Sequence, residues 1–162
     1  MSMQASTPAN QREDRVAARK RAMGILARAT GPELAGPIER LWPACGARDL
    51  KPVETGLVML RGRIGGDGAP FNAGEAKVTR AVVELPSGER GYGHILGRDK
   101  ARARLAAIAD ALWQKPEAQD EVEAAILAPV AARLAAEAAK TRAETAATRV
   151  DFFTLVRGED SP

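Results

Sequence analysis

The sequence of 162 residues is poor in cysteine, histidine and aromatic residues, and each scarcity excludes a class of site. The single cysteine, Cys45, rules out an intrachain disulfide and a self-contained zinc or iron–sulfur centre with four cysteine ligands. The single histidine, His94, leaves no material for a metal centre with two histidine ligands, and we predict no metal site. Aromatic residues make up 4% and are not interleaved with basic ones, so a platform for stacking single-stranded nucleic acid is poorly supported.

Long apolar runs are missing as well. None approaches about 18 residues, so we expect no membrane-spanning segment. The first residues, MSMQASTPANQRED, contain no apolar stretch of the kind that a signal peptide requires. We therefore expect a soluble, cytoplasmic protein.

What the sequence does contain is enough for one globular domain. Apolar residues make up 45% and can form a core, and charged residues at 28% argue against wholesale disorder. We expect residues 1–8 to be a flexible tail and residues 9–160 to be a single domain. The net charge of +3 is uneven, with residues 116–162 acidic and the rest basic. This asymmetry fits an anion site, or only attraction between the two parts of the chain.

Hydrophobic periodicity predicts helices and strands in separate parts of the chain. Helical patterns cover residues 10–29, 32–41, 99–115 and 117–147, the third capped by Asp99 and the last interrupted at Pro129. Strand-like runs cover Glu54–Ile64, Glu75–Leu85, Arg90–Leu96 and residues 149–156. The first three runs are joined by connections too short for parallel crossovers. The predicted fold class is therefore α+β, an antiparallel sheet of about four strands with helices, chiefly 99–115 and 118–147, packed on one face.

Two arginines beside a glycine-rich loop are candidates for binding an anion. Arg61 and Arg63 have the spacing of one strand face, and the loop 62–68 fits neither the P-loop nor the dinucleotide-binding pattern. Paired arginines suit phosphate or carboxylate because of their planar fork of donors. The same spacing also fits the solvent face of a half-exposed sheet, so both interpretations stay open.

A third candidate, Arg98, belongs to a basic cluster at a predicted helix start. Lys100, Arg102 and Arg104 follow it, and four cations there oppose the helix dipole. We expect an anion or partner carboxylates to neutralise them.

No catalytic residue is predicted. His94 is a natural proton carrier near neutral pH, but no motif supplies a carboxylate or a second imidazole beside it. A structural or surface role is therefore favoured for His94. Cys45 lies in a loop and would need His94 as its base to act as a nucleophile, which is a weak signal.

Three segments together resemble a known family. They read ETGLVMLRGRIGGDGAPFNAGEAKVTRA (54–81), GYGHILGRDKARARLAAIADAL (91–112) and ATRVDFFTLVRGED (147–160). They are similar to the G subunit of the bacterial carbon–phosphorus lyase core complex, the machinery that uses phosphonates as a phosphorus source. The resemblance covers roughly residues 10–160, and its last segment is highly specific.

The resemblance implies a function in an assembly. In that family the G subunit sits in a core complex with the H, I and J subunits and is linked to an ATPase-like L subunit. Together they support attack of a phosphonate on C1′ of ATP, with release of adenine. The nucleosidase-like chemistry is ascribed to the I subunit, so a supporting role is implied for this chain. ATP is then a co-substrate of the complex, no cofactor is bound by this chain alone, and neither nucleic acid nor a membrane is a partner.

The alternative is a free-standing basic module that binds nucleic acid or phosphorylated ligands. Its support is the pI of about 9.3 and the basic cluster that begins at Arg98. Duplex and single-stranded DNA binding at two salt concentrations would reveal it.

Overall fold

The computed structural model describes residues 8–65 and 67–148. The chain divides into two compact units, Met1–Ala131 and Ala132–Pro162. The first holds the sheet, all helices before the last one and the start of that last helix. The second holds the remainder of the last helix, and the two units are described separately.

The elements follow one another in the order that the sequence predicts. They are α1 (Pro8–Leu26), α2 (Gly31–Leu41), β1 (Arg48–Arg63), β2 (Pro70–Glu84), β3 (Arg90–Leu96), α3 (Lys100–Trp113), α4 (Pro116–Val122), η1 (Glu123–Leu127) and α5 (Ala128–Ala147). Asp99 caps α3 as predicted, since its carboxylate accepts a hydrogen bond from the backbone N–H of Arg102. Among the described residues, no helix combines the length and the hydropathy needed to cross a bilayer.

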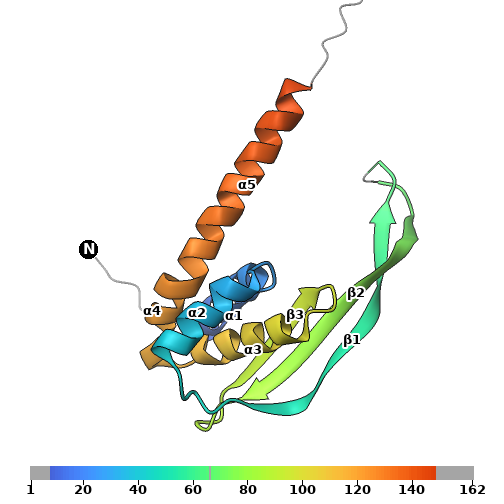
Figure 1. Cartoon of the computed structure of the whole chain (residues 1–162). Coiled ribbons are helices and arrows are strands. Elements are labelled where there is room, and N and C mark those ends of the chain that lie inside the picture. Colours follow the sequence, from blue (N-terminus) through green and yellow to red (C-terminus); the bar gives the residue numbers. More distant parts are fainter. Residues whose placement is uncertain (1–7, 66, 149–162) are drawn as a thin grey trace, which may run out of the picture. The chain divides into compact units, whose positions relative to one another are not determined.

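The three strands form an antiparallel sheet in the order β1-β2-β3, which confirms the predicted meander (Figure 1). β1 and β2 pair along almost their whole length, from Arg48 opposite Glu84 to Arg63 opposite Pro70. β3 pairs with β2 only from Val78 to Glu84. The sheet is therefore three-stranded at its base and continues as a two-stranded hairpin, here called the arm, which comprises residues 56–63 and 70–77.

Helix α3 covers one face of the base because two glycines of β3 let it come close. A Cβ on Gly91 would lie 1.8 Å from the backbone oxygen of Ala107, and one on Gly93 would lie 2.0 Å from that of Ala103. Real Cβ atoms do not approach so near, so glycine is required at both positions. Alanines on the facing side of α3 complete this close contact. Gly91 and Gly93 make β3 harder to recognise as a strand from sequence, yet the packing of α3 on β3 requires them.

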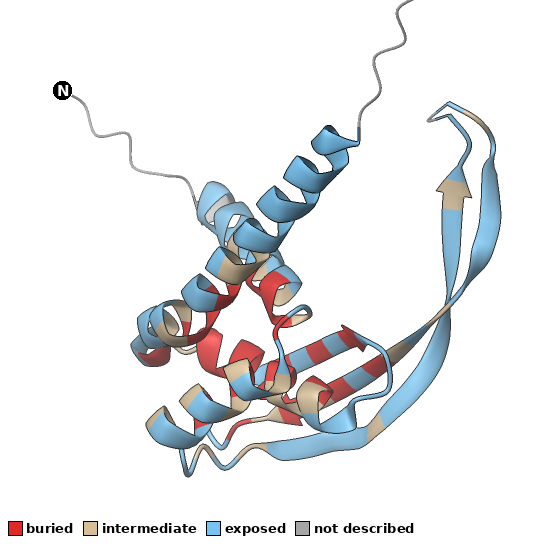
Figure 2. Cartoon of the chain, turned by 45° about the horizontal axis from the view of Figure 1, so that its top comes forward, coloured by how far each residue is buried: buried red, intermediate tan, exposed pale blue. Residues whose placement is uncertain are grey.

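The core lies between the sheet base and the helices, with α3 in its middle (Figure 2). Helices α1, α2 and α4 pack mainly against α3 rather than against the sheet, and η1 packs against α4, α2 and α1. The largest fully buried side chains of the core are Trp113, Leu34, Ile95, Ile126, Leu127, Val83, Val122 and Val130. The Trp113 indole N–H donates to the carboxylate of Glu123 at 2.8 Å, which satisfies the one polar atom of that side chain.

Three element boundaries differ from prediction for identifiable reasons. β1 begins at Arg48 and not at Glu54 as expected. The additional residues include Pro52, which can lie in a strand here because β1 is an edge strand, and their pairing with β2 is interrupted by two shifts in register. β2 begins at Pro70, so the hairpin loop is shorter than expected. The interruption expected at Pro129 falls earlier: η1 is a π-helical turn, and the N–H of Ala128 bonds the Glu123 oxygen five residues back. The expected fourth strand, 149–156, lies outside the described residues.

The second unit is simpler. Its described residues continue α5, and none of them is buried. Ion pairs one turn apart, Arg133 with Glu137 and Lys140 with Glu144, lie along the helix.

Candidate functional site

The face of the sheet opposite α3 is open and carries a shallow hollow of about 360 Å³. Its lining residues are Lys51, Pro52, Glu54, Arg80, Val82, Tyr92 and His94. The strand alternation explains this grouping, because His94 pairs with Arg80 across the sheet and Tyr92 pairs with Val82. The chain's one histidine therefore lies on a solvent-facing surface and not in the core.

The hollow is weakly basic and contains no catalytic pair. Arg80 forms an ion pair with Glu54 at 3.6 Å, and both side chains are more than half exposed. Among the described residues, neither Lys51 nor His94 has a hydrogen-bond or ion-pair partner. An imidazole without a hydrogen-bonded carboxylate lacks the orienting group that general-base catalysis uses. The hollow can offer cations to an anion, but it does not form a proton relay.

On the same face of the sheet, three charged residues lie side by side across the strands: Arg48 of β1, Glu84 of β2 and Arg90 of β3. Glu84 accepts hydrogen bonds from both Arg48 and Arg90. These bonds, chiefly those from Arg48, lower the pKa of Glu84 below its ordinary value. Each of the two arginines is bound to Glu84, so neither is a free anion receptor.

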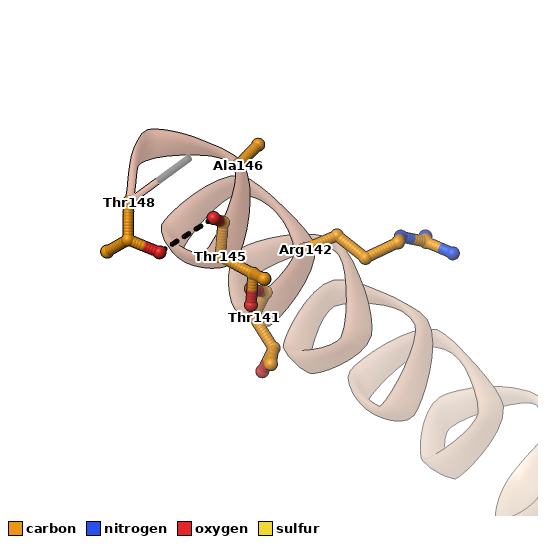
Figure 3. A pocket seen from close by; sticks show the side chains of 5 residues that line it. All are labelled: Thr141, Arg142, Thr145, Ala146 and Thr148. Atoms are coloured by element: carbon orange, nitrogen blue, oxygen red, sulfur yellow. Dashed lines mark hydrogen bonds between the residues drawn. The ribbon is translucent and has the colours of Figure 1, made fainter. Parts of the chain in front are cut away.

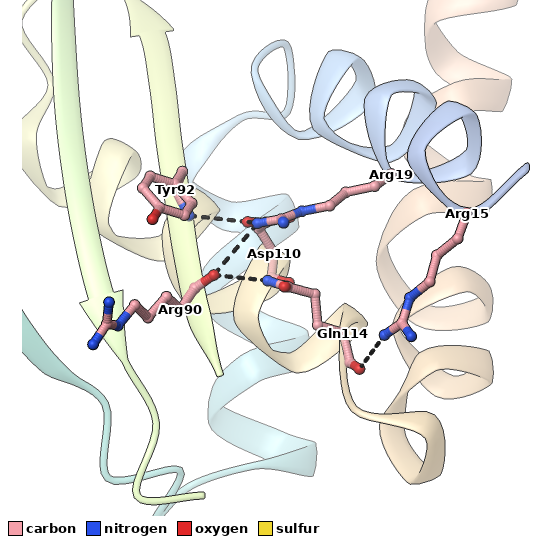
Figure 4. A network of polar contacts seen from close by, with 6 residues as sticks. All are labelled: Arg15, Arg19, Arg90, Tyr92, Asp110 and Gln114. Atoms are coloured by element: carbon pink, nitrogen blue, oxygen red, sulfur yellow. Dashed lines mark hydrogen bonds and ion pairs between the residues drawn. The ribbon is translucent and has the colours of Figure 1, made fainter. Parts of the chain in front are cut away.

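A buried carboxylate fastens β3 to the helices (Figure 4). The Asp110 side chain is fully buried, and Arg19 of α1 binds both its oxygens, at 3.0 and 2.7 Å. The backbone N–H of Tyr92 donates to Asp110 at 2.9 Å, and the Arg19 guanidinium also lies 5.7 Å from the centre of the Tyr92 ring. Hydrogen bonding to Asp110 raises the pKa of Arg19 further, so the guanidinium stays charged. We interpret this network as structural, since it joins α1, α3 and β3.

Side chains of α1, of α3 and of its C-cap residue Gln114 cover the free edge of β3. The backbone oxygen of Arg90 accepts hydrogen bonds from Gln114 at 2.8 Å and from Arg19 at 3.4 Å. Arg102 donates to the backbone oxygen of Leu96 at 2.9 Å. Backbone groups that would otherwise form an unpaired strand edge are thus satisfied from the helical side.

The structure does not bring the three predicted anion-binding arginines together. Arg61 and Arg63 lie at the end of the arm, opposite Asn72 and Pro70. Arg98 follows Gly97, whose N–H bonds the backbone oxygen of Lys77. Five residues of β2 separate these two places, roughly 15 Å along the strand. Arg98 therefore lies apart from the two arginines at the end of the arm.

The side chains of the arm-tip arginines differ in their contacts. Arg63 donates to the backbone oxygen of Gly68 at 3.2 Å and so braces the hairpin loop. Arg61 has no hydrogen-bond or ion-pair partner among the described residues. Arg61 is the freer of the two for an external anion.

Two of the four cations in the basic cluster at the start of α3 are used in internal contacts. Arg104 pairs with Asp49 at 2.7 Å and donates to the backbone oxygen of Ala47 at 2.9 Å. Arg102 donates to the oxygens of Leu96 and Ala29. The expectation that carboxylates neutralise this cluster is met for Arg104. Exposed Arg98 is left with no partner among the described residues, and the support that the cluster lent to a free-standing basic module is reduced.

Two other candidate features gain no support from the described residues. Cys45 is free and half-buried in the α2–β1 connection, and it is not among the residues that line the hollow with His94. In the part of the chain that the structure describes, no group of three or more His, Cys, Asp or Glu side chains could hold a metal ion.

A second hollow lies on the last turns of α5 (Figure 3). Its threonine hydroxyls are occupied by their own helix: Thr148 donates to Thr145, and Thr145 donates to Thr141. A depression on one helix whose hydroxyls are already bonded is not a convincing site.

The arm is the feature that sequence reasoning missed. In the arm, β1 exposes four large apolar side chains and β2 adds Phe71, whereas in the base β2 and β3 bury alternate residues (Figure 2). The exposed apolar residues there are Leu57, Val58, Met59, Leu60 and Phe71, with Ile64 in the loop. A signal was present: four consecutive apolar residues in β1 depart from the alternation of a half-buried strand.

Comparison with known proteins identifies a family and a curated relative. Residues 17–158 match a family described as "Phosphonate metabolism protein PhnG". A protein of Rhizobium meliloti (strain 1021) is 56% identical over 149 residues, which cover 90% of this chain and 92% of the relative. That relative is named alpha-D-ribose 1-methylphosphonate 5-triphosphate synthase subunit PhnG.

Proposed function

Because the chain belongs to the PhnG family of phosphonate metabolism proteins, we propose that it is a subunit of α-D-ribose 1-methylphosphonate 5-triphosphate synthase. The observation that carries this proposal is the 56% identity to a subunit of that synthase over 92% of the relative's length. In the reaction, a phosphonate oxygen bonds to C1′ of ATP while the bond from C1′ to adenine breaks.

The proposal also names the partner subunits and the cellular location of the complex. We assign to the chain the H, I and J subunits as partners in a core complex, with a functional link to the ATPase-like L subunit. ATP is a co-substrate of that complex, the chain alone binds no cofactor, and the complex is cytoplasmic. These assignments rest on the family resemblance and are tested by co-purification of the tagged chain with each subunit.

Within the complex we assign the chain a supporting role. Departure of adenine needs a group that assists the leaving base, together with charge stabilisation around the ribose and the triphosphate. In the described residues, His94 has no carboxylate partner, which supports the view that another subunit supplies the acid–base groups. Arg61, Arg63 and Arg98 can supply positive charge, each at an anionic contact of its own.

Reconstitution tests this role. The purified chain should show no adenine release from ATP and methylphosphonate, and the complex should show it. The His94→Ala complex should keep its activity within about tenfold, equivalent to about 1.4 kcal/mol of barrier. A loss of a thousandfold or more in an intact complex would show that this chain contributes catalytic chemistry.

A further inference from the structure

Both faces of the arm expose large apolar side chains, which belong to β1 apart from Phe71. Beyond the last pairing of β3 at Val78, only β1 and β2 continue. Successive side chains of a strand point to opposite sides, so Leu57 and Met59 lie on one face of β1 and Val58 and Leu60 on the other. Their exposed fractions are 59%, 48%, 47% and 49% in that order. Neither face of the arm is therefore covered by the residues that the structure describes.

Such an arm is unsuited to exist alone in water. A two-stranded hairpin is marginally stable without a third strand or a packed layer. Among residues 8–65 and 67–148 no strand pairs with the outer edge of β1, and β1 has no charged side chain from Gly56 to Leu60 to discourage association. The free edge of β3, in contrast, is covered by Asp110, Gln114 and Arg102. The protein thus protects one edge and leaves the more apolar one open.

We propose that the arm is inserted into an apolar groove of another subunit of the synthase, which covers both faces of the hairpin. This inference rests on the proposed function, because it takes its partner from the assembly to which the relative belongs. The continuous apolar run of β1 is typical of a strand buried on both sides. In the assembled complex, the apolar residues 57–60 of β1 would be buried on both sides of the hairpin, as their composition favours.

Two observations favour a different chain over a second copy as the occupant. A symmetric dimer places the same patch of each copy against the other, so it buries one face of each arm and leaves the second face bare. A groove in another subunit covers both. The arm also ends in Arg61 and Arg63, and two copies placed tip to tip would repel one another. We therefore expect acidic side chains of the partner where the tip arrives.

The test compares one substitution at two exposed valines. Val58→Asp places a charge on the arm, and Val16→Asp places it on α1, where Val16 is 63% exposed. Met59→Asp tests the opposite face of the arm. Each tagged full-length variant is co-expressed with the H, I and J subunits, and the partner recovered per mole of chain is measured. Circular dichroism and thermal melting check that each variant is folded.

We expect Val58→Asp and Met59→Asp each to reduce recovery of a partner subunit at least tenfold, and Val16→Asp to leave it within twofold. Val58→Thr keeps the shape and the strand propensity, and should give a smaller loss in the same direction if the aspartate variants fold poorly. Recovery equal to wild type for both aspartate arm variants would overturn the proposal, as would an equal loss for Val16→Asp. Reduced recovery for only one of Val58→Asp and Met59→Asp would overturn the claim that the groove covers both faces of the arm.

Two further outcomes are separable. If the wild-type chain recovers none of the subunits, the proposed function fails before the arm is tested. If the chain alone sediments as a dimer that Val58→Asp dissociates, while recovery of the other subunits is unchanged, the occupant is a second copy and the proposal is overturned.

Discussion

Strands β1 and β2 run through both the base and the arm, yet the surroundings of the two regions differ. In the base, β2 buries alternate residues such as Ala81 and Val83 under α3, and the far edge of β3 is bonded to side chains of the helices. In the arm, the same strands expose apolar residues on both faces. The fully buried Thr79 lies near the boundary, where its hydroxyl contacts Thr55 at 2.9 Å and the backbone oxygen of Gly97 at 2.8 Å.

The difference indicates that the base determines the stability of the fold and that the arm serves association with a partner. The base is closely packed and its polar groups are satisfied, so changes there should affect the free energy of unfolding. The arm contributes little burial of its own, so changes there should affect assembly instead. Each of the following substitutions asks whether that division holds.

The largest effect is expected where α3 lies directly on β3. Gly91→Ala introduces a methyl group into the backbone of Ala107 and should destabilise the chain by about 3 kcal/mol. The matched change in the arm, Gly56→Ala, meets no atom within 4 Å and should change stability by about 0.5 kcal/mol or less. Urea denaturation of both variants measures this. Equal losses would show that base and arm do not differ in packing.

The next effect concerns the charge pair of Figure 4. Arg19→Met leaves the fully buried carboxylate of Asp110 without its cation and should cost about 2 kcal/mol, moderated because Arg19 is 30% exposed. Arg21→Met, on the same helix, breaks a more exposed pair with Glu123 and should cost about 0.5 kcal/mol. Thermal melts compare the two variants. A larger loss at Arg21 would contradict the role assigned to the Asp110 network.

A smaller, pH-dependent effect is expected at Glu84. Because the pKa of Glu84 is lowered in the folded chain, its charged form stabilises the fold above the unfolded value of about 4.3. That stabilisation is lost as the pH falls through the lowered folded pKa. The urea midpoint of wild type should therefore exceed that of Glu84→Gln near neutral pH and converge with it in acid. A difference that persists unchanged at pH 2 would contradict the ion-pair interpretation.

The smallest effect on stability should come from the arm itself. Met59→Thr and Leu57→Thr alter side chains that are about half exposed, and the isolated chain should change by no more than about 0.5 kcal/mol. Ile95→Thr, at a buried position of the base, provides the contrast and should be clearly destabilising. Chemical denaturation of the three variants checks this. Losses in the arm as large as that at Ile95 would mean that the arm is packed in the free chain.

Much of the base could be predicted from sequence because its signals are local. The cap at Asp99, the order of helices and strands and the antiparallel pairing all follow from spacing and short turns. The burial of Asp110 could not be foreseen. Its partners, Arg19 and the N–H of Tyr92, come from segments distant in sequence.

The candidate site was harder to predict than the fold. The arginines of the basic cluster look alike in sequence, but Arg102 and Arg104 are used in internal contacts and Arg98 is not. The closeness of His94 to Arg80 depends on strand register, which the sequence leaves open. The exposure of the arm depends on β3 being shorter than its neighbours, which no single segment reveals.

Amide hydrogen exchange of the chain, alone and in the purified complex, tests the central claim most directly. The account predicts that amides of α3 and β3 are protected in both states, and that the amides of β1 from Gly56 to Leu60 exchange rapidly in the free chain and slowly in the complex. Arm amides that exchange equally fast in both states, or that are already protected in the free chain, would contradict the claim that the arm is built to be covered by a partner.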